Sequence, residues 1–157
     1  MKRGVRAAAA LALAVAFTGT ACSNSDSDKS GTGAASTTTT SAAPVAADKL
    51  PSLVPTPENS KGAPSPENIG DNGIHLHFEV NGSPKAVMDG YKAALTDKGW
   101  AVTTIVTSIS EGGGGATYTG TNGAAYGVFD GGGFNTTTFV NVCVWPTKPA
   151  DPNCTRS

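Results

Sequence analysis

Charged and aromatic residues are scarce in this chain of 157 residues. Asp, Glu, Lys and Arg together make up 15% of the sequence, Phe, Trp and Tyr make up 6%, and the formal net charge is −1. A protein that binds nucleic acid usually carries a clustered basic face. The composition therefore argues against a nucleic-acid partner and against electrostatic docking on a membrane.

Motifs for catalysis or cofactor binding are also missing from the sequence. The glycine run 112–115 is not followed by the Lys-Ser/Thr pair of a P-loop, and the GxGxxG spacing fails. No G-x-S-x-G elbow is present, and the only histidines are His75 and His77. We predict a protein that is not an enzyme and has no cofactor, with a hydrolase or metal site at His75 or His77 as the least favoured alternative.

Long apolar runs are absent apart from one short segment near the start. Residues 1–6 carry three cations, and residues 7–17 (AAAALALAVAF) are uncharged. As a helix this segment would reach about 16 Å, well short of the roughly 30 Å hydrocarbon core of a bilayer. The pattern predicts a signal peptide over residues 1–21 rather than a transmembrane helix.

Cysteine occurs three times, and the first, Cys22, directly follows the small residues Thr18-Gly19-Thr20-Ala21. This arrangement resembles the lipobox of bacterial lipoproteins of the actinobacterial and mycobacterial type, although Gly19 stands where Leu, Val or Ile is commonest. The resemblance implies cleavage before Cys22, a diacylglycerol group (and palmitate) on the new N-terminus, and anchoring at the extracytoplasmic face of the cell membrane. The alternative is an ordinary secretory signal that leaves Cys22 as a free thiol.

The other two cysteines, Cys143 and Cys154, are close together near the C-terminal end. An exported chain meets an oxidising compartment, so we predict a disulfide between them. It would close a loop of about a dozen residues and add about 3 kcal/mol of stability in the chain-entropy model. Two free thiols or a metal pair are the alternatives, and no CxxC motif or His-rich partner supports the metal.

Residues 22–66 are rich in Ser, Thr, Ala, Gly and Pro, without aromatic residues. Such a segment has too little apolar surface to offset its ordering entropy. The composition predicts a disordered tether that holds the remaining domain, residues 67–157, away from the membrane. The Ser/Thr run at 37–41 is a candidate for O-linked glycosylation, and a bare spacer is the alternative.

The domain at 67–157 shows alternating segments, one segment with helical spacing, and an Asn-Gly turn at 122–123. These patterns predict an α+β fold, a single small domain with an antiparallel sheet of about five strands and one amphipathic helix on one face, in the order β-α-β-β-β-β. The glycine runs 112–115 and 131–133 are expected to be connections. The expected elements are strand 74–80, helix 84–98, and strands 100–109, 116–121, 124–130 and 137–145.

Alternation also sorts the side chains by face. The small and apolar set is expected to receive the helix, and consists of Ala116, Tyr118, Gly120, Ala125, Gly127 and Phe129. The opposite, outer face is threonine-rich and includes a candidate binding face made of His75, His77, Tyr126, Phe139 and Trp145. The alternative is that the C-terminal tail folds over these aromatic residues and buries them. His75, His77 and Glu79 could also reach one metal ion, but a solvated polar face explains the same alternation, and we expect no metal.

One further resemblance concerns YKAAL and GW, at 91–95 and 99–100. It is similar to a stretch in many secreted or lipidated actinobacterial proteins, and it carries no catalytic residue. The function that the sequence favours is a lipid-anchored envelope lipoprotein with a non-catalytic binding domain, whose partner is an envelope protein or a glycan. The alternative function is a carrier or sensor of a small apolar ligand held between helix and sheet.

Overall fold

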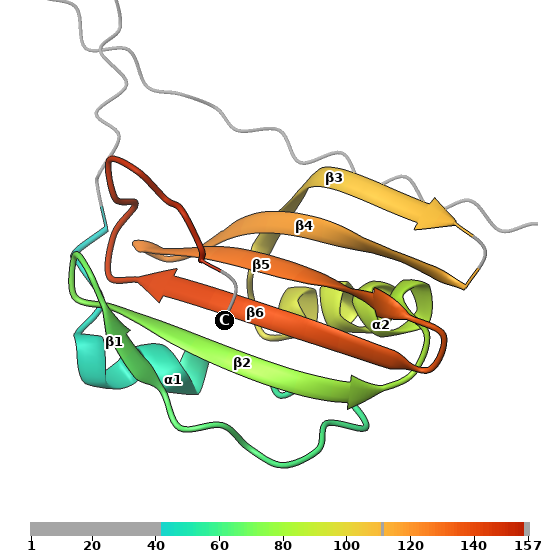
Figure 1. The fold of residues 1–157 in the computed structure, drawn as a ribbon. Helices are drawn as coiled ribbons and strands as arrows, with labels where there is room; N and C mark the ends of the chain where they lie inside the picture. Colours follow the sequence, from blue (N-terminus) through green and yellow to red (C-terminus); the bar gives the residue numbers. More distant parts are fainter. Residues whose placement is uncertain (1–41, 111, 156–157) are drawn as a thin grey trace, which may run out of the picture. The chain divides into compact units, whose positions relative to one another are not determined.

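The computed structural model describes residues 42–110 and 112–155 (Figure 1). The predicted signal peptide, Cys22, and the tether up to residue 41 lie outside the described residues. The described part forms one antiparallel sheet in the order β1-β2-β6-β5-β4-β3, with helix α2 packed on it. The predicted α+β class is therefore confirmed, with six strands where about five were expected. The elements are η1 (Ala47–Lys49), α1 (Leu50–Leu53), β1 (Glu67–Ile69), β2 (Gly73–Asn81), α2 (Pro84–Asp97), β3 (Ala101–Ser110), β4 (Gly113–Asn122), β5 (Ala125–Phe134) and β6 (Thr137–Trp145).

Helix α2 begins and ends where the sequence predicts. Ser83 is extended and Pro84 occupies the first turn, where its missing N–H has no helical partner to lose. At the other end Gly99 has φ +92°, a conformation that favours glycine. The helix buries Met88, Tyr91 and Leu95 against the sheet.

The inner face of the sheet carries the main core, as the alternation predicts. Ala116 and Tyr118 of β4 and Ala125 and Phe129 of β5 are all buried in the cluster that includes the helix residues. Trp100 packs edge-on against Phe129, with ring centroids 5.1 Å apart. The small residues of β4 and β5 let the helix approach closely.

Residues 42–66 correct one prediction, because they belong to the folded unit and are not a disordered tether. Leu50 is fully buried, and Val45, Leu53 and Val54 pack against the core. The indole N–H of Trp100 donates to the Leu53 carbonyl at 2.8 Å. The average composition of the segment concealed this short apolar cluster, which has enough buried surface to hold the chain on the sheet.

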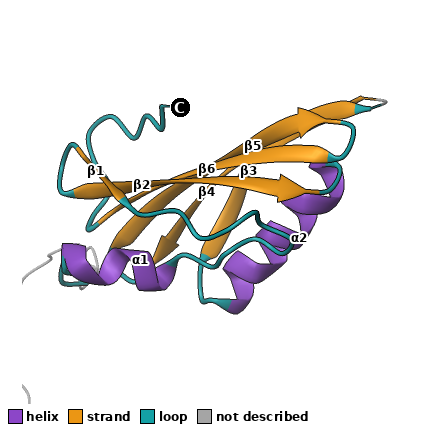
Figure 2. Ribbon diagram, turned by 60° about the horizontal axis from the view of Figure 1, so that its bottom comes forward, coloured by secondary structure: helices purple, strands orange, loops and turns teal. Residues whose placement is uncertain are grey.

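Both helices lie on the same side of the sheet, and the C-terminal segment lies on the opposite side (Figure 2). Before β1, the chain pairs with β2 at an isolated bridge between Ser60 and Val80. Strand β1 then pairs with the start of β2, from Glu67 opposite His75 to Ile69 opposite Gly73. Among the described residues, the helices therefore cover the inner face and the tail crosses the outer face.

The two glycine runs correct a second prediction, because they are paired strands and not connections. Gly113–Gly115 lie in β4 opposite Gly132–Phe134 of β5, with Gly115 facing Gly132 and Gly114 facing Gly133. A Cβ on Gly115 would collide with the carbonyl of Gly131, so only glycine permits this backbone approach. The hairpin strands are thus longer than the sequence pattern indicates, and five of the six residues in their distal part are glycine.

Candidate functional site

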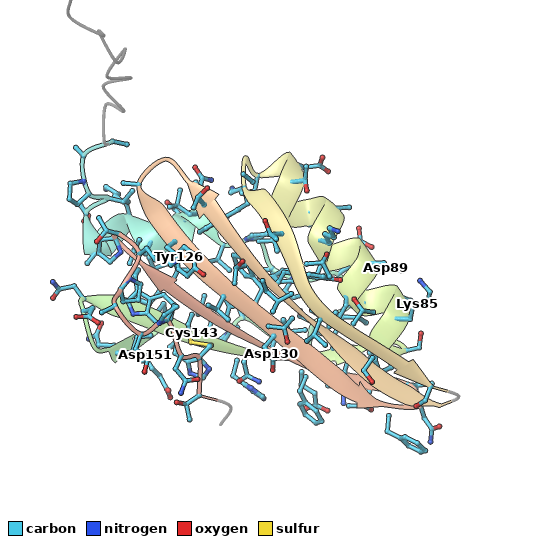
Figure 3. All side chains as sticks on the ribbon, turned by 90° about the horizontal axis from the view of Figure 1, so that it is seen from above. Lys85, Asp89, Tyr126, Asp130, Cys143 and Asp151 are labelled. Atoms are coloured by element: carbon cyan, nitrogen blue, oxygen red, sulfur yellow. A yellow bond between two sulfur atoms is a disulfide. The ribbon has the colours of Figure 1, made fainter. Side chains whose placement is uncertain are left out.

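The outer face of the sheet has two unlike ends. The first, called the closed end below, is the part covered by the C-terminal tail, with Val128, Cys143, Trp145 and Cys154 packed together. The predicted disulfide joins Cys143 and Cys154 and is confirmed. Figure 3 shows this disulfide beneath the C-terminal segment, with Asp130 farther along the sheet.

The closed end buries two of the five residues that were candidates for a binding face. Trp145 is 3% exposed, and its indole N–H donates to the Gly70 carbonyl at 3.1 Å. His75 is 6% exposed. Tyr126 is half-buried beside Trp145, under the ammonium group of Lys148. The alternative in which the tail covers the aromatic residues is therefore correct for this end.

The second end, called the open end, contains a hollow of about 550 Å³ that we name the outer hollow. Its lining comes from five strands, β3, β4, β5, β6 and β2. The volume falls within the ~300–1,000 Å³ typical of small-molecule sites. The hollow has no signal in the sequence, because glycine runs such as those that form its floor are also typical of loops.

A row of polar side chains crosses one side of the outer hollow. Thr117, Asp130, Asn141 and His77 occupy directly paired positions on β4, β5, β6 and β2. The Thr117 hydroxyl donates to the Asp130 carboxylate at 2.6 Å. Asp130 is 7% exposed and Asn141 is 3% exposed, so the row is held within the sheet surface rather than extended into solvent.

Asn141 connects the two ends of the outer face. Its side-chain oxygen lies 3.2 Å from His75 Nε2, at the closed end, and 3.0 Å from His77 Nδ1, at the open end. A carbonyl oxygen only accepts, so in this arrangement both ring nitrogens donate. The second nitrogen of His75, Nδ1, lies 3.4 Å from a carboxylate oxygen of Glu67. Each histidine ring is therefore held in a fixed orientation.

An aromatic wall borders the outer hollow at the His77 end of this row. The rings of His77 and Phe139 are stacked, with centroids 5.8 Å apart and an interplanar angle of 20°. Phe139 is 44% exposed, which is unusual for a Phe on a sheet face beside a buried core. The hollow therefore combines an open apolar ring with a row of hydrogen-bonding groups.

The charge of the outer hollow is set by very few residues. Among the described residues that line it, Asp130 is the carboxylate, His77 is the histidine, and none is Lys or Arg. Ser108 of β3 adds a hydroxyl at the rim, beside the apolar Val106. An anionic ligand would meet no cationic side chain in this lining, whereas a neutral ligand would meet hydroxyl, amide and carboxylate groups.

The three residues of the unfavoured metal alternative, His75, His77 and Glu79, have different partners. His75 and His77 both contact Asn141, whereas Glu79 pairs with the Lys61 ammonium at 2.6 Å. His75 does lie near the two sulfur atoms of Cys143 and Cys154, all within 4.8 Å of one another. Those sulfurs are joined in the disulfide, so neither is a thiolate that could ligate a metal.

The space between helix and sheet, where an apolar ligand would lie in the alternative function, is filled by side chains. Met88, Tyr91 and Leu95 from the helix side meet Trp100 and Phe129, and each is at most 2% exposed. The Tyr91 hydroxyl is buried without a hydrogen-bond partner in the part of the chain that the structure describes. Burial raises the pKa of this hydroxyl far above its ordinary value of 10.0.

Comparison with known proteins gives no match to a family model, to a curated protein or to a solved structure. Within the described residues, no helix is both long and apolar enough to span a bilayer.

Proposed function

We propose that the folded unit is a non-catalytic binding module whose outer hollow takes a neutral, polyhydroxylated ligand, such as a segment of a glycan. The observation that supports this most is the pairing of a polar row with an exposed aromatic ring in one hollow. Binding sites are commonly concave and apolar, with a few placed polar groups that fix orientation. This hollow fits that description.

The expectation of a neutral ligand follows from the charges of the residues that line the outer hollow. A phosphate or carboxylate ligand would be repelled by the Asp130 carboxylate, because no Lys or Arg in the lining balances that charge. A hydroxyl group, in contrast, can donate to the Asp130 carboxylate and accept from the Ser108 hydroxyl. Hydrogen bonds to a charged acceptor are also the stronger kind.

The aromatic wall explains why a sugar ring suits the hollow better than a small polar molecule. A pyranose ring presents a face of C–H groups and a rim of hydroxyls. The exposed face of Phe139 can cover the C–H groups, while Asp130 and Asn141 reach the rim. The hollow is open to solvent at its mouth, so a longer chain of sugars can continue past it.

The position of the hollow agrees with a domain held at the membrane by its N-terminus. Residue 42 enters the fold near the closed end, where the N–H of Val45 donates to the Pro146 carbonyl (Figure 1). The glycine hairpins of the open end lie at the other end of the strands. Lipid anchoring at Cys22 is part of this proposal.

Ligand binding is tested by isothermal titration calorimetry with a panel of neutral oligosaccharides, their phosphorylated counterparts and short extended peptides. We expect heat from at least one neutral oligosaccharide, lost in the Phe139→Ala and Asp130→Asn variants. Phe134→Ala is the matched control, because Phe134 is 65% exposed but does not line the hollow. Binding only of phosphorylated sugars, or equal loss in the control, would refute the proposal.

Lipid anchoring is tested separately, by the intact mass of the protein extracted from its native membrane without reduction. We expect the mass of residues 22–157 plus a diacylglycerol group, less two hydrogens for the disulfide. A mass for residues 22–157 without lipid would identify a secreted protein, and would leave the proposal for the outer hollow unaffected.

A further inference from the structure

Strand β3, residues Ala101–Ser110, forms one edge of the sheet and leaves its outer side unpaired. Within residues 42–110 and 112–155, its backbone partners all belong to β4. The opposite edge is different, because β1 has only three residues. A strand of ten residues therefore offers a row of N–H and C=O groups that can accept another strand.

The usual protection of an edge strand is largely missing from β3. Residues 101–110 (AVTTIVTSIS) include no charged residue and no proline, which are the common means of blocking edge pairing. A bulge interrupts the register between Thr104 and Val106, so that Ile105 has no partner in β4. Ile105 is 59% exposed and Val106 is 52% exposed. Covering these two β-branched side chains would remove apolar surface from water.

We propose that β3 pairs antiparallel with β3 of a second copy of this chain. An antiparallel pair of identical strands is related by a two-fold axis. A residue near the axis therefore lies opposite the same residue, or one close to it in sequence, in the other copy. A charged strand would place like charges opposite each other, which is unfavourable. Residues 101–110 have no charge and avoid this repulsion. The short β1 edge leaves the joined sheet little room to add further copies, so the assembly closes at two.

Pairing of the β3 strands would also join the outer hollows of the two copies. This second step of the inference rests on the proposed function. Val106 and Ser108 line the outer hollow from β3. A two-fold axis perpendicular to the sheet keeps the outer faces of both copies on the same side. The two hollows would then meet across the axis as one longer trough, in which the second copy supplies Val106 and Ser108 to the first. A long glycan would span both copies.

Cysteine cross-linking in the native envelope tests the pairing directly. Single variants Thr103→Cys, Thr104→Cys, Thr107→Cys and Ser108→Cys place an exposed thiol along β3, and mild oxidation links only thiols whose Cα atoms approach within about 7 Å. Thr121→Cys and Asn135→Cys are controls at exposed positions off this edge. The parent chain controls for dimers formed through Cys22. We expect disulfide-linked dimer at one or two neighbouring β3 positions and not at the controls.

A charged variant keeps the test independent of the cross-linking chemistry. Adding Val106→Lys to the best cross-linking variant places two ammonium groups beside the axis, and we expect loss of the dimer band. Equal cross-linking at all six positions, or persistence of the dimer with Val106→Lys, would overturn the proposal. Cross-links from β3 to a different protein would also overturn it. Sugar binding by an uncross-linked monomer would leave the proposed function intact.

Discussion

The closed and open ends of the outer face are built on the same strands but in opposite ways. At the closed end, Cys143, Trp145 and Val128 are covered by the tail and fixed by a disulfide. At the open end the corresponding positions of β4 and β5 are Gly115 and Gly132, opposite each other and without side chains. Large side chains and a cover make one end a second core, whereas glycine, with no covering segment among residues 42–110 and 112–155, makes the other a hollow.

This difference indicates a division of roles along the strands. Stability on the outer face is concentrated at the closed end, where apolar side chains are buried. The open end exposes Phe139 and Val106 to solvent and gains little from folding. The binding role proposed above depends on this exposed ring of Phe139.

The largest expected effect comes from truncating one aromatic residue at each end, which distinguishes the contributions of the two ends to stability. Trp145→Ala removes a buried side chain and should lower the free energy of unfolding by about 3–5 kcal/mol. Phe139→Ala removes a half-exposed ring and should cost less than about 1 kcal/mol. Urea denaturation of both variants measures the difference. Similar losses in the two variants would mean that the ends do not differ in their contribution to stability.

Removing the disulfide tests how much the cover contributes. The Cys143→Ser/Cys154→Ser variant, or the reduced parent protein, should lose about 3 kcal/mol, because the unfolded chain regains the entropy of the closed loop. Fluorescence of Trp145 should shift to the red as the tail loosens. Ligand affinity of the outer hollow should stay within about twofold, since the disulfide does not line it. A large loss of affinity would show that the two ends are coupled.

Asn141→Ala probes the link between the ends. It leaves His75 Nε2 at the closed end and His77 Nδ1 at the open end without their acceptor. Leaving buried polar groups unpaired should cost about 1–3 kcal/mol. Nuclear magnetic resonance of the imidazole protons should report changes in both rings. A change confined to one ring would contradict the shared hydrogen bonds described above.

The smallest effect on the free energy of unfolding is expected on the inner face. A substitution there serves as a reference for those at the two ends of the outer face. Tyr91→Phe removes a buried hydroxyl without a partner and should raise stability by about 1 kcal/mol at neutral pH. Because the pKa of Tyr91 is raised in the folded state, the unfolded chain ionises first, and stability should fall as pH rises above 10.0. The variant should show a shallower fall. An unchanged pH slope would mean that Tyr91 ionises equally in both states.

Much of the fold could be predicted from local patterns. Alternation along 74–80 and 137–145, the Pro84 and Gly99 boundaries and the Asn-Gly turn were enough to define the sheet and its helix. The disulfide was predicted from the number of cysteines and from the expected export of the chain. These features depend on neighbouring residues, and a single sequence shows them directly.

The candidate site could be predicted only in part, because it depends on pairing between distant strands. Glycine is typical of both loops and close strand contacts, so Gly113–Gly115 and Gly131–Gly133 gave no signal of the hollow until their register was known. His77 and Phe139 were identified, but so were His75 and Trp145, which the tail buries. Leu50 was missed since a few apolar residues were averaged with a polar segment.

The entry of the chain beside the end of β6 has a mechanical consequence. Residue 42 and the outer hollow lie toward opposite ends of the strands, so a pull between the N-terminal attachment and a bound ligand acts along the strand direction. The hydrogen bonds of β6 with β2 and β5 then resist the force together, in shear, and do not open one at a time. With the proposed lipid anchor and the proposed ligand, the domain would hold the ligand under tension without unzipping its sheet.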